Sequence, residues 1–387
     1  MKITKGFKIR IYPTKEQEEL IWKHIHTCRF VWNYMLNLQE ERYKSGEKHL
    51  SAFSMIKELM PLKNDGNHEW MYEVSNGSMQ VICRDLDKAY KEFFKKAQKH
   101  PRFKSRKKMK PSYPVNADKF YFADEKFCQI QMLGRVRYKT DFTFPIGRNV
   151  CKFYNVRIQH RPARNIWILT LTMEIESQEP ELTDIHMGID LGVKELAVVA
   201  FGDQKTVFHN INKSRNVRQL EAKLKHIQRS ISRKYEASKK RTGKHEKTNN
   251  IIKEEQKLRR IQDRLNGIRH NYIHQTTHAL ISMVPKMVTM EDLHVTQMIK
   301  QNNHKMRREI IACSFNEFLR QMEYKCLWNG IEFIKADRFY PSSKTCSSCG
   351  SIKKDLKLND RTYVCPECGL TIDRDYNAAI NLMRYVA

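Results

Sequence analysis

Four cysteines near the end of the sequence have the types and the spacing of metal ligands: Cys346, Cys349, Cys365 and Cys368. They form two Cys-x-x-Cys pairs with fifteen residues between them, and a glycine directly follows each pair. This spacing is typical of a four-thiolate zinc site, and glycine permits the tight turns that such a site needs. Because four thiolates complete a tetrahedral ion and leave no position for a substrate, the pattern predicts a structural zinc.

Three acidic residues lie at the ends of predicted elements, where a carboxylate needs a partner. Asp190 lies in the apolar strand around "GIDLG", Glu291 ends the apolar run before "EDL", and Asp375 begins the final helix "YNAAINLMRYV". A carboxylate in an apolar strand is costly unless it is paired, hydrogen-bonded or bound to metal. For Asp190 alone, a hydrogen bond within a turn is the ordinary alternative. Mg²⁺ prefers oxygen ligands, and two such ions can clamp a phosphodiester for hydrolysis.

The first half of the sequence predicts a strand, a helical bundle and then more strands. Residues 7–11 alternate apolar and polar, as a half-exposed strand does. Thr14-x-x-Gln17 is a capping box that opens a helix, and further helices are expected near residues 49–59 and 78–99. From about 113 to 176 the pattern is that of β-strands. We therefore expect a small barrel or sheet, with the helical bundle inserted after its first strand.

The second half predicts a different order of elements. A polar, proline-containing segment, "SQEPELTD", is a plausible domain boundary. Three short strands follow within 185–209, then long basic helices from 212 to 278, a strand at 287–290, one amphipathic helix over 308–330 and a strand at 331–338. The zinc segment and the last helix complete the chain. This is a ribonuclease H-like arrangement, in which acids from separated strands and the final helix converge on divalent metal.

The charge of the chain indicates a polyanionic partner. Lys and Arg total 71 and Asp and Glu total 43, which gives a net charge of +28. Nucleic acid is the natural partner for such an excess. Membrane attachment is disfavoured because no apolar run reaches the roughly 20 residues that a spanning helix needs. The beginning of the chain is patterned as a strand and not as a signal peptide, so the cysteines are expected to be reduced or metal-bound.

Several motifs, taken in order, resemble the TnpB (OrfB) family: "IRIYPTKEQEELI", "CRFVWNYML", "DKAYKEFF", "HPRFKSRKK", "GIDLGVKELAVV", "MEDL", "FYPSSKTCSSCG", "YVCPECG" and "DRDYNAAINL". These proteins are compact, transposon-encoded RNA-guided DNA endonucleases, related to the compact type V CRISPR effectors. The resemblance spans nearly the whole chain. The C-terminal motifs are highly specific together, whereas each N-terminal motif is weaker alone.

The resemblance implies an α+β multidomain architecture. The expected parts are a β-barrel wedge domain (1–12 and 101–178), an inserted helical recognition domain (13–100) and a RuvC-like nuclease domain (179–342 and 370–387). The nuclease domain would carry a helical insertion at about 212–284 and a zinc-binding element at 343–369. It also implies a noncoding guide RNA from the transposon end and a double-stranded DNA target, cut next to a target-adjacent motif after unwinding to single strands.

By motif match, the catalytic acids are Asp190, Glu291 and Asp375, which would bind catalytic Mg²⁺. Asp373 is the rival of Asp375 and is expected to cap or orient the last helix. Candidate nucleic-acid contacts are Gln80, for the target-adjacent motif, and the basic segment with Arg102, Lys104, Arg106, Lys107 and Lys108. The family also implies a monomeric, cytoplasmic prokaryotic protein that is associated with the nucleoid when bound to DNA.

Two other functions remain open on the sequence. Relatives that lose catalytic acids act as RNA-guided DNA-binding repressors, but all three acids are present here. A transposase that joins DNA ends, or an accessory protein of transposition, is the weaker alternative, because the match to the guided nucleases extends along the whole chain. The zinc element is expected to fix the start of the last helix or to help load single-stranded DNA, and the sequence does not decide between these roles.

Overall fold

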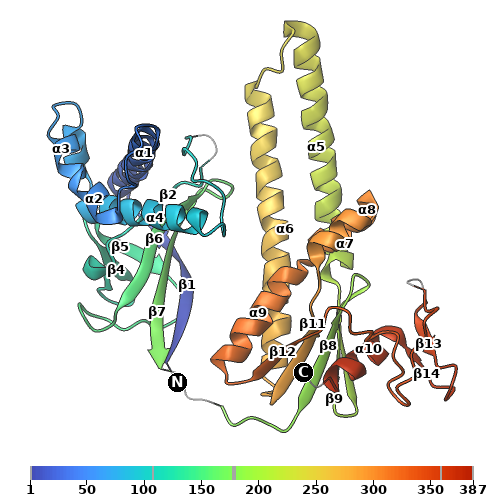
Figure 1. The fold of residues 1–387 in the computed structure, drawn as a ribbon. Helices are drawn as coiled ribbons and strands as arrows, with labels where there is room; N and C mark the ends of the chain where they lie inside the picture. The colour runs from blue at the N-terminus through green and yellow to red at the C-terminus, as the bar shows by residue number, and fades with distance from the viewer. Residues whose placement is uncertain (1, 107–108, 177–179, 358–359, 386–387) are drawn as a thin grey trace. The chain divides into compact units, whose positions relative to one another are not determined.

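The computed structural model describes residues 2–106, 109–176, 180–357 and 360–385. The chain forms two compact units, Lys2–Glu176 and Ser177–Ala387, which are described separately (Figure 1). The division falls at the beginning of the polar segment that the sequence analysis took as a boundary. Lys107 and Lys108, two of the predicted nucleic-acid contacts, lie outside the described residues.

The N-terminal unit contains a seven-stranded sheet of order β2-β6-β7-β1-β5-β4-β3. The strands are β1 (Lys2–Tyr12), β2 (Ser112–Pro114), β3 (Tyr121–Phe122), β4 (Phe127–Ile130), β5 (Gly134–Lys139), β6 (Phe153–Arg161) and β7 (Ile166–Glu176). All of its strand pairs are antiparallel. Among the described residues the sheet does not close into the predicted barrel. Its two edge strands, β2 and β3, have only three and two residues, too short a ladder to join the edges.

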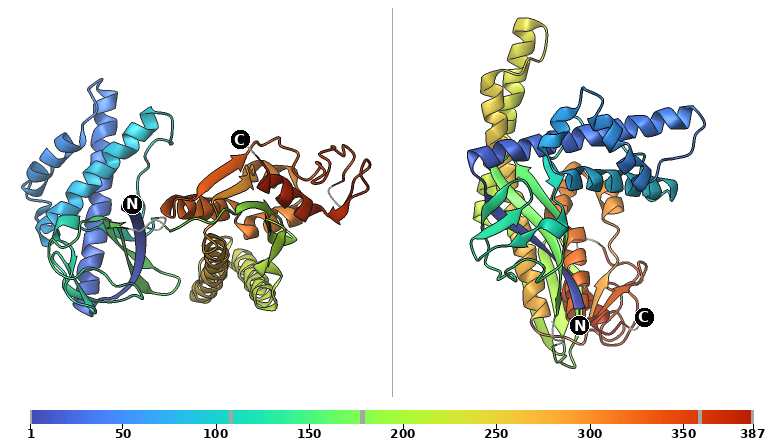
Figure 2. Two further views of the ribbon diagram at one scale, coloured as in Figure 1. Left: turned by 90° about the horizontal axis from the view of Figure 1, so that it is seen from below. Right: turned by 90° about the vertical axis from the view of Figure 1, so that its left-hand side faces the viewer.

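Helices pack on this sheet and share its core. They are α1 (Lys15–Lys44), α2 (Ala52–Lys57), α3 (Leu59–Lys63) and α4 (Asn76–Phe94), with short 3₁₀ turns η1 (Glu69–Glu73) and η2 (Ala117–Lys119). The predicted capping box is present at Thr14 and Gln17. One cluster of buried residues includes Ile9 of β1, Val31 of α1 and Leu86 of α4. The long α1 is evident in Figure 2. The predicted barrel and helical segments thus form one unit.

The C-terminal unit contains a five-stranded sheet of order β10-β9-β8-β11-β12. Its strands are β8 (His186–Leu191), β9 (Glu195–Phe201), β10 (Gln204–His209), β11 (Met287–Glu291) and β12 (Glu332–Ala336). The first three are antiparallel neighbours, whereas β11 runs parallel to both β8 and β12. A separate hairpin joins β13 (Thr362–Val364) and β14 (Thr371–Asp373). The order of the five sheet strands along the chain agrees with the sequence prediction for this half.

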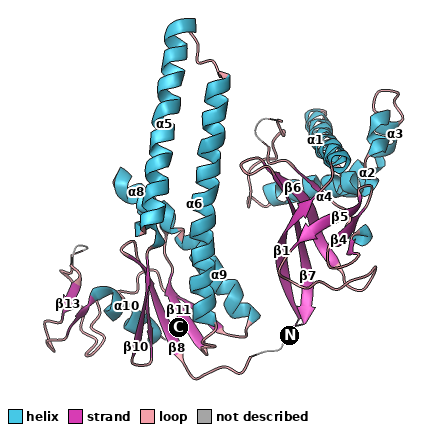
Figure 3. Cartoon of the chain, turned by 180° about the vertical axis from the view of Figure 1, so that it is seen from behind, coloured by secondary structure: helices cyan, strands magenta, loops and turns pink. Residues whose placement is uncertain are grey.

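The helices of this unit cover both faces of the sheet. They are η3 (Ile211–Lys213), α5 (Arg215–Thr242), α6 (Asn249–Ile281), α7 (Val295–Gln301), α8 (His304–Cys313), α9 (Phe315–Trp328) and α10 (Arg374–Met383). Figure 3 shows α5 and α6 as a long hairpin that extends beyond the sheet. Ile189 and Val199 face α6 and α9, whereas Val198 and Ala200 face α10. No helix in the described part of the chain is long and apolar enough to span a membrane.

The single helix predicted for residues 308–330 is wrong. Helix α8 ends at Cys313, and α9 begins at Phe315, because Ser314 adopts a left-handed conformation with φ of 54°. Such a conformation is uncommon for a residue other than glycine, so it interrupts the helix sharply. The break lets Ile310 and Cys313 on one side of it and Phe318 on the other all reach the same buried core.

Candidate active site and zinc element

Two of the predicted catalytic acids lie at the same edge of the C-terminal sheet. Asp190 is near the end of β8 and Glu291 ends β11, and the parallel register of these strands places Met290 opposite Ile189. The carboxyl ends of neighbouring parallel strands are where α/β sheets place their ligands. Side chains alternate between the faces of a strand. Because Met187 and Ile189 face α6 and α9, Asp190 lies on the opposite face, with α10.

The third acid, Asp375, belongs to α10, and the backbone of this helix contacts the backbone of β8 directly. A Cβ atom added at Gly188 would lie 2.1 Å from the carbonyl oxygen of Ala379 and 2.2 Å from the nitrogen of Met383. The absence of a side chain at Gly188 therefore lets the backbone of α10 pack directly against β8, two residues before Asp190. Asp375, in the first turn of α10, keeps only 14% of its side chain exposed. The structure thus gathers Asp190, Glu291 and Asp375 around one edge of the sheet.

Asp373 has a different role from Asp375. It is the N-cap residue of α10, and its carboxylate accepts a hydrogen bond of 2.9 Å from the backbone N–H of Tyr376. Its side chain is 42% exposed and lies 3.6 Å from Lys205. A side chain that accepts from an otherwise unpaired N–H stabilises the start of a helix. This is the capping role that the sequence analysis expected for Asp373.

The gathered carboxylates repel one another. Burial, and then the negative charges of Glu291 and Asp375, raise the pKa of Asp190 well above its ordinary value. Burial also raises the pKa of Glu291, although a hydrogen bond from Ser342 opposes the shift. Arg374 and Arg361 approach Asp375 at 3.5 and 3.7 Å, which offsets part of the charge. A raised carboxylate pKa among like charges marks a place where a cation would be stabilised.

The donor set suits Mg²⁺, because it consists of hard carboxylate oxygens. The three acids are not among the groups of described residues whose ligand atoms all lie within 4.8 Å of one another. They therefore do not form a closed cage for one ion. An open, carboxylate-lined edge is compatible with ions that keep several water ligands, as Mg²⁺ does.

Ser342 connects Glu291 to the last helix. The Ser342 hydroxyl donates a hydrogen bond to Oε1 of Glu291, and its backbone carbonyl accepts one of 2.7 Å from the amide of Asn381 in α10. Ser342 is 2% exposed, and Asn381 is 5% exposed. A carboxylate held in this way by buried partners keeps its orientation. The sequence analysis missed both residues, although a pair of asparagines four residues apart in an apolar helix was a usable signal.

The four predicted zinc ligands lie together. Their sulfur atoms are all within 4.8 Å of one another, with Sγ–Sγ distances of 3.6 Å for Cys346 and Cys368 and 3.5 Å for Cys349 and Cys365. A tetrahedral zinc with bonds of about 2.3 Å requires sulfurs about 3.8 Å apart. Gly350 and Gly369 have φ of 77° and 73°, as the predicted tight turns require. The cluster is therefore a four-thiolate site that fits zinc.

The zinc element is tied to α10 by side-chain amides. Asn377, which has no exposed surface, accepts a hydrogen bond of 2.9 Å from the backbone N–H of Ser347 and donates one of 2.7 Å to the carbonyl of Thr345. Arg384 donates to the carbonyl of Ser347. The hairpin strand β14 runs directly into α10. These contacts link the first cysteine turn to the helix that carries Asp375.

Removing two thiolates is expected to release the ion and to loosen α10. With Cys365→Ser and Cys368→Ser together, elemental analysis should find at least about tenfold less zinc per chain, because the remaining pair cannot close a tetrahedral site. The matched control is Cys128→Ser, at a buried cysteine far from the cluster in sequence. Undiminished zinc in the double variant, or an absence of zinc in the wild-type protein, would contradict a zinc site here.

The predicted nucleic-acid contacts are only partly exposed. Arg102 and Arg106 are exposed, but Lys104 is partly buried, with its Nζ 3.4 Å from the centroid of the Trp32 ring. Burial lowers the pKa of Lys104 to about 8. Hydrogen bonds of 2.8 and 3.0 Å also join its backbone to Asn33. Lys104 therefore holds the basic segment on α1. Gln80 is partly exposed on α4.

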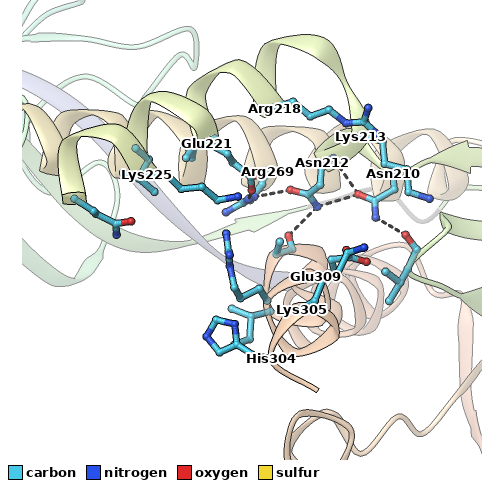
Figure 4. Close-up of a pocket in the computed structure, with 17 residues that line it drawn as sticks. Asn210, Asn212, Lys213, Arg218, Glu221, Lys225, Arg269, His304, Lys305 and Glu309 are labelled. Carbon is cyan, nitrogen blue, oxygen red and sulfur yellow. Dashed lines mark hydrogen bonds and ion pairs between the residues drawn. The ribbon is translucent and has the colours of Figure 1, made fainter. Parts of the chain in front are cut away.

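A basic pocket lies at the base of the α5–α6 hairpin, a feature that the sequence analysis did not identify (Figure 4). Its volume is about 700 Å³, and helices α5, α6 and α8 line it. Six cationic and two acidic side chains contribute to its wall. The cationic ones are Lys213, Arg218, Lys225, Arg269, Lys305 and Arg308. Arg269 is fixed by contacts of 2.7 Å with both Glu221 and Asn212.

Comparisons with known proteins agree with this architecture. Three family models match the chain: "Helix-turn-helix domain" over residues 1–48, "Probable transposase" over 170–302 and "Cas12f1-like, TNB domain" over 315–382. The first of these regions contains β1 and the single helix α1 in this structure. The last contains the cysteine cluster and most of α10.

Similar proteins match over nearly the full length. "Putative RNA-guided DNA endonuclease InsQ" of Escherichia coli (strain K12) is 30% identical over 401 residues, which cover 99% of this chain and 92% of that protein. A "Putative RNA-guided DNA endonuclease" of Streptomyces pristinaespiralis is 28% identical and covers 99% and 89%. "TnpB-like protein L770" of Acanthamoeba polyphaga mimivirus is 22% identical and covers 97% and 72%.

A solved structure shares the fold. The protein of the "Cryo-EM structure of the Cas12f1-sgRNA-target DNA complex" superposes with a TM-score of 0.57 at 14% identity, over 99% of each chain. The chain thus shares the mixed α/β fold of that protein, and its residues 315–382 match the TNB domain model. Because a relative is 30% identical over nearly the full length of both chains, this chain belongs to the TnpB family.

Proposed function

We propose that this protein is an RNA-guided DNA endonuclease that hydrolyses phosphodiester bonds in double-stranded DNA next to a target-adjacent motif. The observation that carries the proposal is the meeting of Asp190, Glu291 and Asp375 at one sheet edge, with a raised pKa at Asp190. The names of its relatives support the guided activity. The presence of all three acids favours cleavage over a repressor that only binds.

The C-terminal unit is, on this proposal, a RuvC-like nuclease domain with the ribonuclease H-like order of elements. Its sheet order and the placement of α10 against β8 support this assignment. We further assign α5 and α6 as its helical insertion and residues 343–369 as its zinc-binding element. In the N-terminal unit, residues 13–100 form the recognition helices, and the sheet takes the place of the expected wedge barrel.

The three carboxylates would hold Mg²⁺, which supplies charge neutralisation and an activated water for phosphodiester hydrolysis. The protein itself contributes position and charge. Glu291 is oriented by the Ser342 hydroxyl, and Asp375 is brought to the site by a helix that Asp373 caps. Arg374 and Arg361 lie beside Asp375 and offset part of the negative charge of the three acids. Zinc at the four cysteines would stabilise the turn that leads into α10.

The guide RNA and the DNA would be held mainly through their phosphates. The net charge of +28 supports such a partner, and the pocket between α5, α6 and α8 offers a concentration of cationic groups that suits a phosphate. Phosphate contacts position a nucleic acid, whereas contacts with base edges specify its sequence. Gln80, Arg102 and Arg106 stay candidates for contacts in the N-terminal unit.

Two linked measurements test the proposal. We expect an RNA to co-purify in a stoichiometric amount, and sequencing it should reveal a guide whose end can be exchanged to redirect cleavage. Binding should weaken steeply with salt, because counterions are released from each contacted phosphate. An RNA-free preparation that still selects the same DNA sequence would contradict guiding. A guide-loaded protein that binds its target but never cuts it with Mg²⁺ or Mn²⁺ would establish the repressor function instead.

A further inference from the structure

A second cluster of metal-binding side chains lies between α6 and α9. His270 and His274 are four residues apart in α6, and Glu317 lies in the first turn of α9. One ligand atom from each of the three lies within 4.8 Å of the others. Residues four apart share a face of a helix, so both imidazoles are directed to the same side. The cluster is separate from the four cysteines and from the three acids.

The distances suit a small coordination sphere. The Nε2 atoms of the two histidines are 3.1 Å apart, and one nitrogen of each ring lies within 4.8 Å of a carboxylate oxygen of Glu317. Two ligands of a tetrahedral ion with bonds of about 2.1 Å lie about 3.4 Å apart. The three side chains are partly exposed, with His270 46% and Glu317 26% exposed. An ion could therefore enter from solvent, and water could complete its coordination.

Buried partners fix the carboxylate of this cluster. Gln321, which has no exposed surface, donates a hydrogen bond of 2.8 Å to Oε1 of Glu317 and accepts one of 3.0 Å from the hydroxyl of Thr277. On the outer side, Arg320 donates to both oxygens of Glu317 at 2.7 and 2.9 Å. Ligating carboxylates are themselves usually hydrogen-bonded, and such partners orient them for the metal. Together Gln321 and Arg320 occupy three of the roughly four lone-pair sites of the carboxylate, which leaves one on Oε2 for a metal.

We propose that His270, His274 and Glu317 bind a divalent transition-metal ion that joins α6 to α9. Two imidazoles and a carboxylate favour zinc, nickel or copper over Mg²⁺, which prefers oxygen ligands alone. The ion would fasten the base of the α5–α6 hairpin to a helix that covers the sheet. Its role is structural, and it does not depend on the nuclease activity proposed above.

The test uses untagged, full-length protein as purified, with the cysteine cluster left intact. Calorimetric titration with Zn²⁺ should show one further equivalent bound per chain, and the bound ion should raise the melting temperature. His270→Ala and His274→Ala should each weaken this binding by at least about tenfold, and Glu317→Gln should also weaken it. His278→Ala, one helical turn further along α6 and exposed, is the matched control and should bind as the wild type does. Mg²⁺ should not compete.

Cobalt provides a second, spectroscopic measurement. Co²⁺ added to protein in which only the cysteine cluster holds zinc should give weak visible bands without thiolate charge-transfer bands, because the new ligands are nitrogen and oxygen. Circular dichroism should show that the variants remain folded. The proposal is overturned if the wild-type protein takes up no further equivalent of Zn²⁺. It is overturned equally if His278→Ala lowers the affinity as much as His274→Ala does, since that would indicate nonspecific histidine binding.

Discussion

Asp375→Asn is expected to lower guided DNA cleavage by more than about 100-fold, whereas Asp373→Asn should leave most of it. Loss of a residue that hydrogen-bonds a metal ligand typically lowers metal affinity or activity roughly 10–100-fold. Loss of a direct ligand should lower activity more. The two variants are matched, because both replace a carboxylate with an amide of the same shape in the same turn. Asn can still cap a helix, so Asp373→Asn preserves the start of α10.

Cleavage and binding should be measured side by side, with the same guide and target. DNA binding should persist in Asp375→Asn and in the corresponding Asp190→Asn variant, because the cationic pocket that we propose for phosphate contains none of the three acids. Asp373→Ala should cost about 1 kcal/mol of stability through the lost cap, with cleavage retained at permissive temperature. The assignment is reversed if Asp373→Asn is inactive while Asp375→Asn still cuts.

Gly188→Ala is expected to destabilise the C-terminal unit by about 3 kcal/mol or more. The added methyl group would lie 2.1 Å and 2.2 Å from backbone atoms of α10, which cannot rotate away as a side chain would. The helix must therefore shift, and Asp375 shifts with it. Thermal and urea unfolding, together with cleavage at low temperature, would separate lost stability from lost geometry.

Gly6→Ala is the matched control for this substitution. Gly6 also lies in a strand, but the nearest atom to its added Cβ is a side-chain methyl of Thr172 at an ordinary 3.7 Å. Removing a strand glycine without a clash should be neutral or should stabilise the protein by roughly 0.5–1 kcal/mol. Equal behaviour of the two variants would show that α10 does not depend on the close contact at Gly188.

The sequence was most informative where function depends on local spacing. The cysteine pairs and their glycines are close in sequence, so their geometry could be read directly. The acids could be found because each stands at the end of an apolar run. Asp373 and Asp375 could be told apart only by motif resemblance. The hydrogen bond from the Tyr376 N–H to the Asp373 carboxylate now gives a physical reason to assign Asp373 as the helix cap.

Features that depend on distant partners could not be predicted. Glu317 lies more than forty residues from His270 and His274, so the cluster exists only once α6 and α9 pack together. Closure of the N-terminal sheet depends on the lengths of its edge strands, which the β-pattern does not specify. The break at Ser314 was also not predicted. An amphipathic pattern continues through it, and the position with positive φ holds serine and not glycine.

The four thiols also make the protein sensitive to oxidants. Sulfurs 3.5–3.6 Å apart can share an ion, but without one the same proximity favours disulfides across the two turns. Hydrogen bonds from the backbone N–H of Cys368 and from the Ser351 hydroxyl lower the pKa of Cys365 to about 5, and thiolate character favours oxidation. Asn377 and Arg384 connect this element to the helix that carries Asp375. We therefore expect peroxide that displaces the ion to abolish cleavage without modifying an acidic residue.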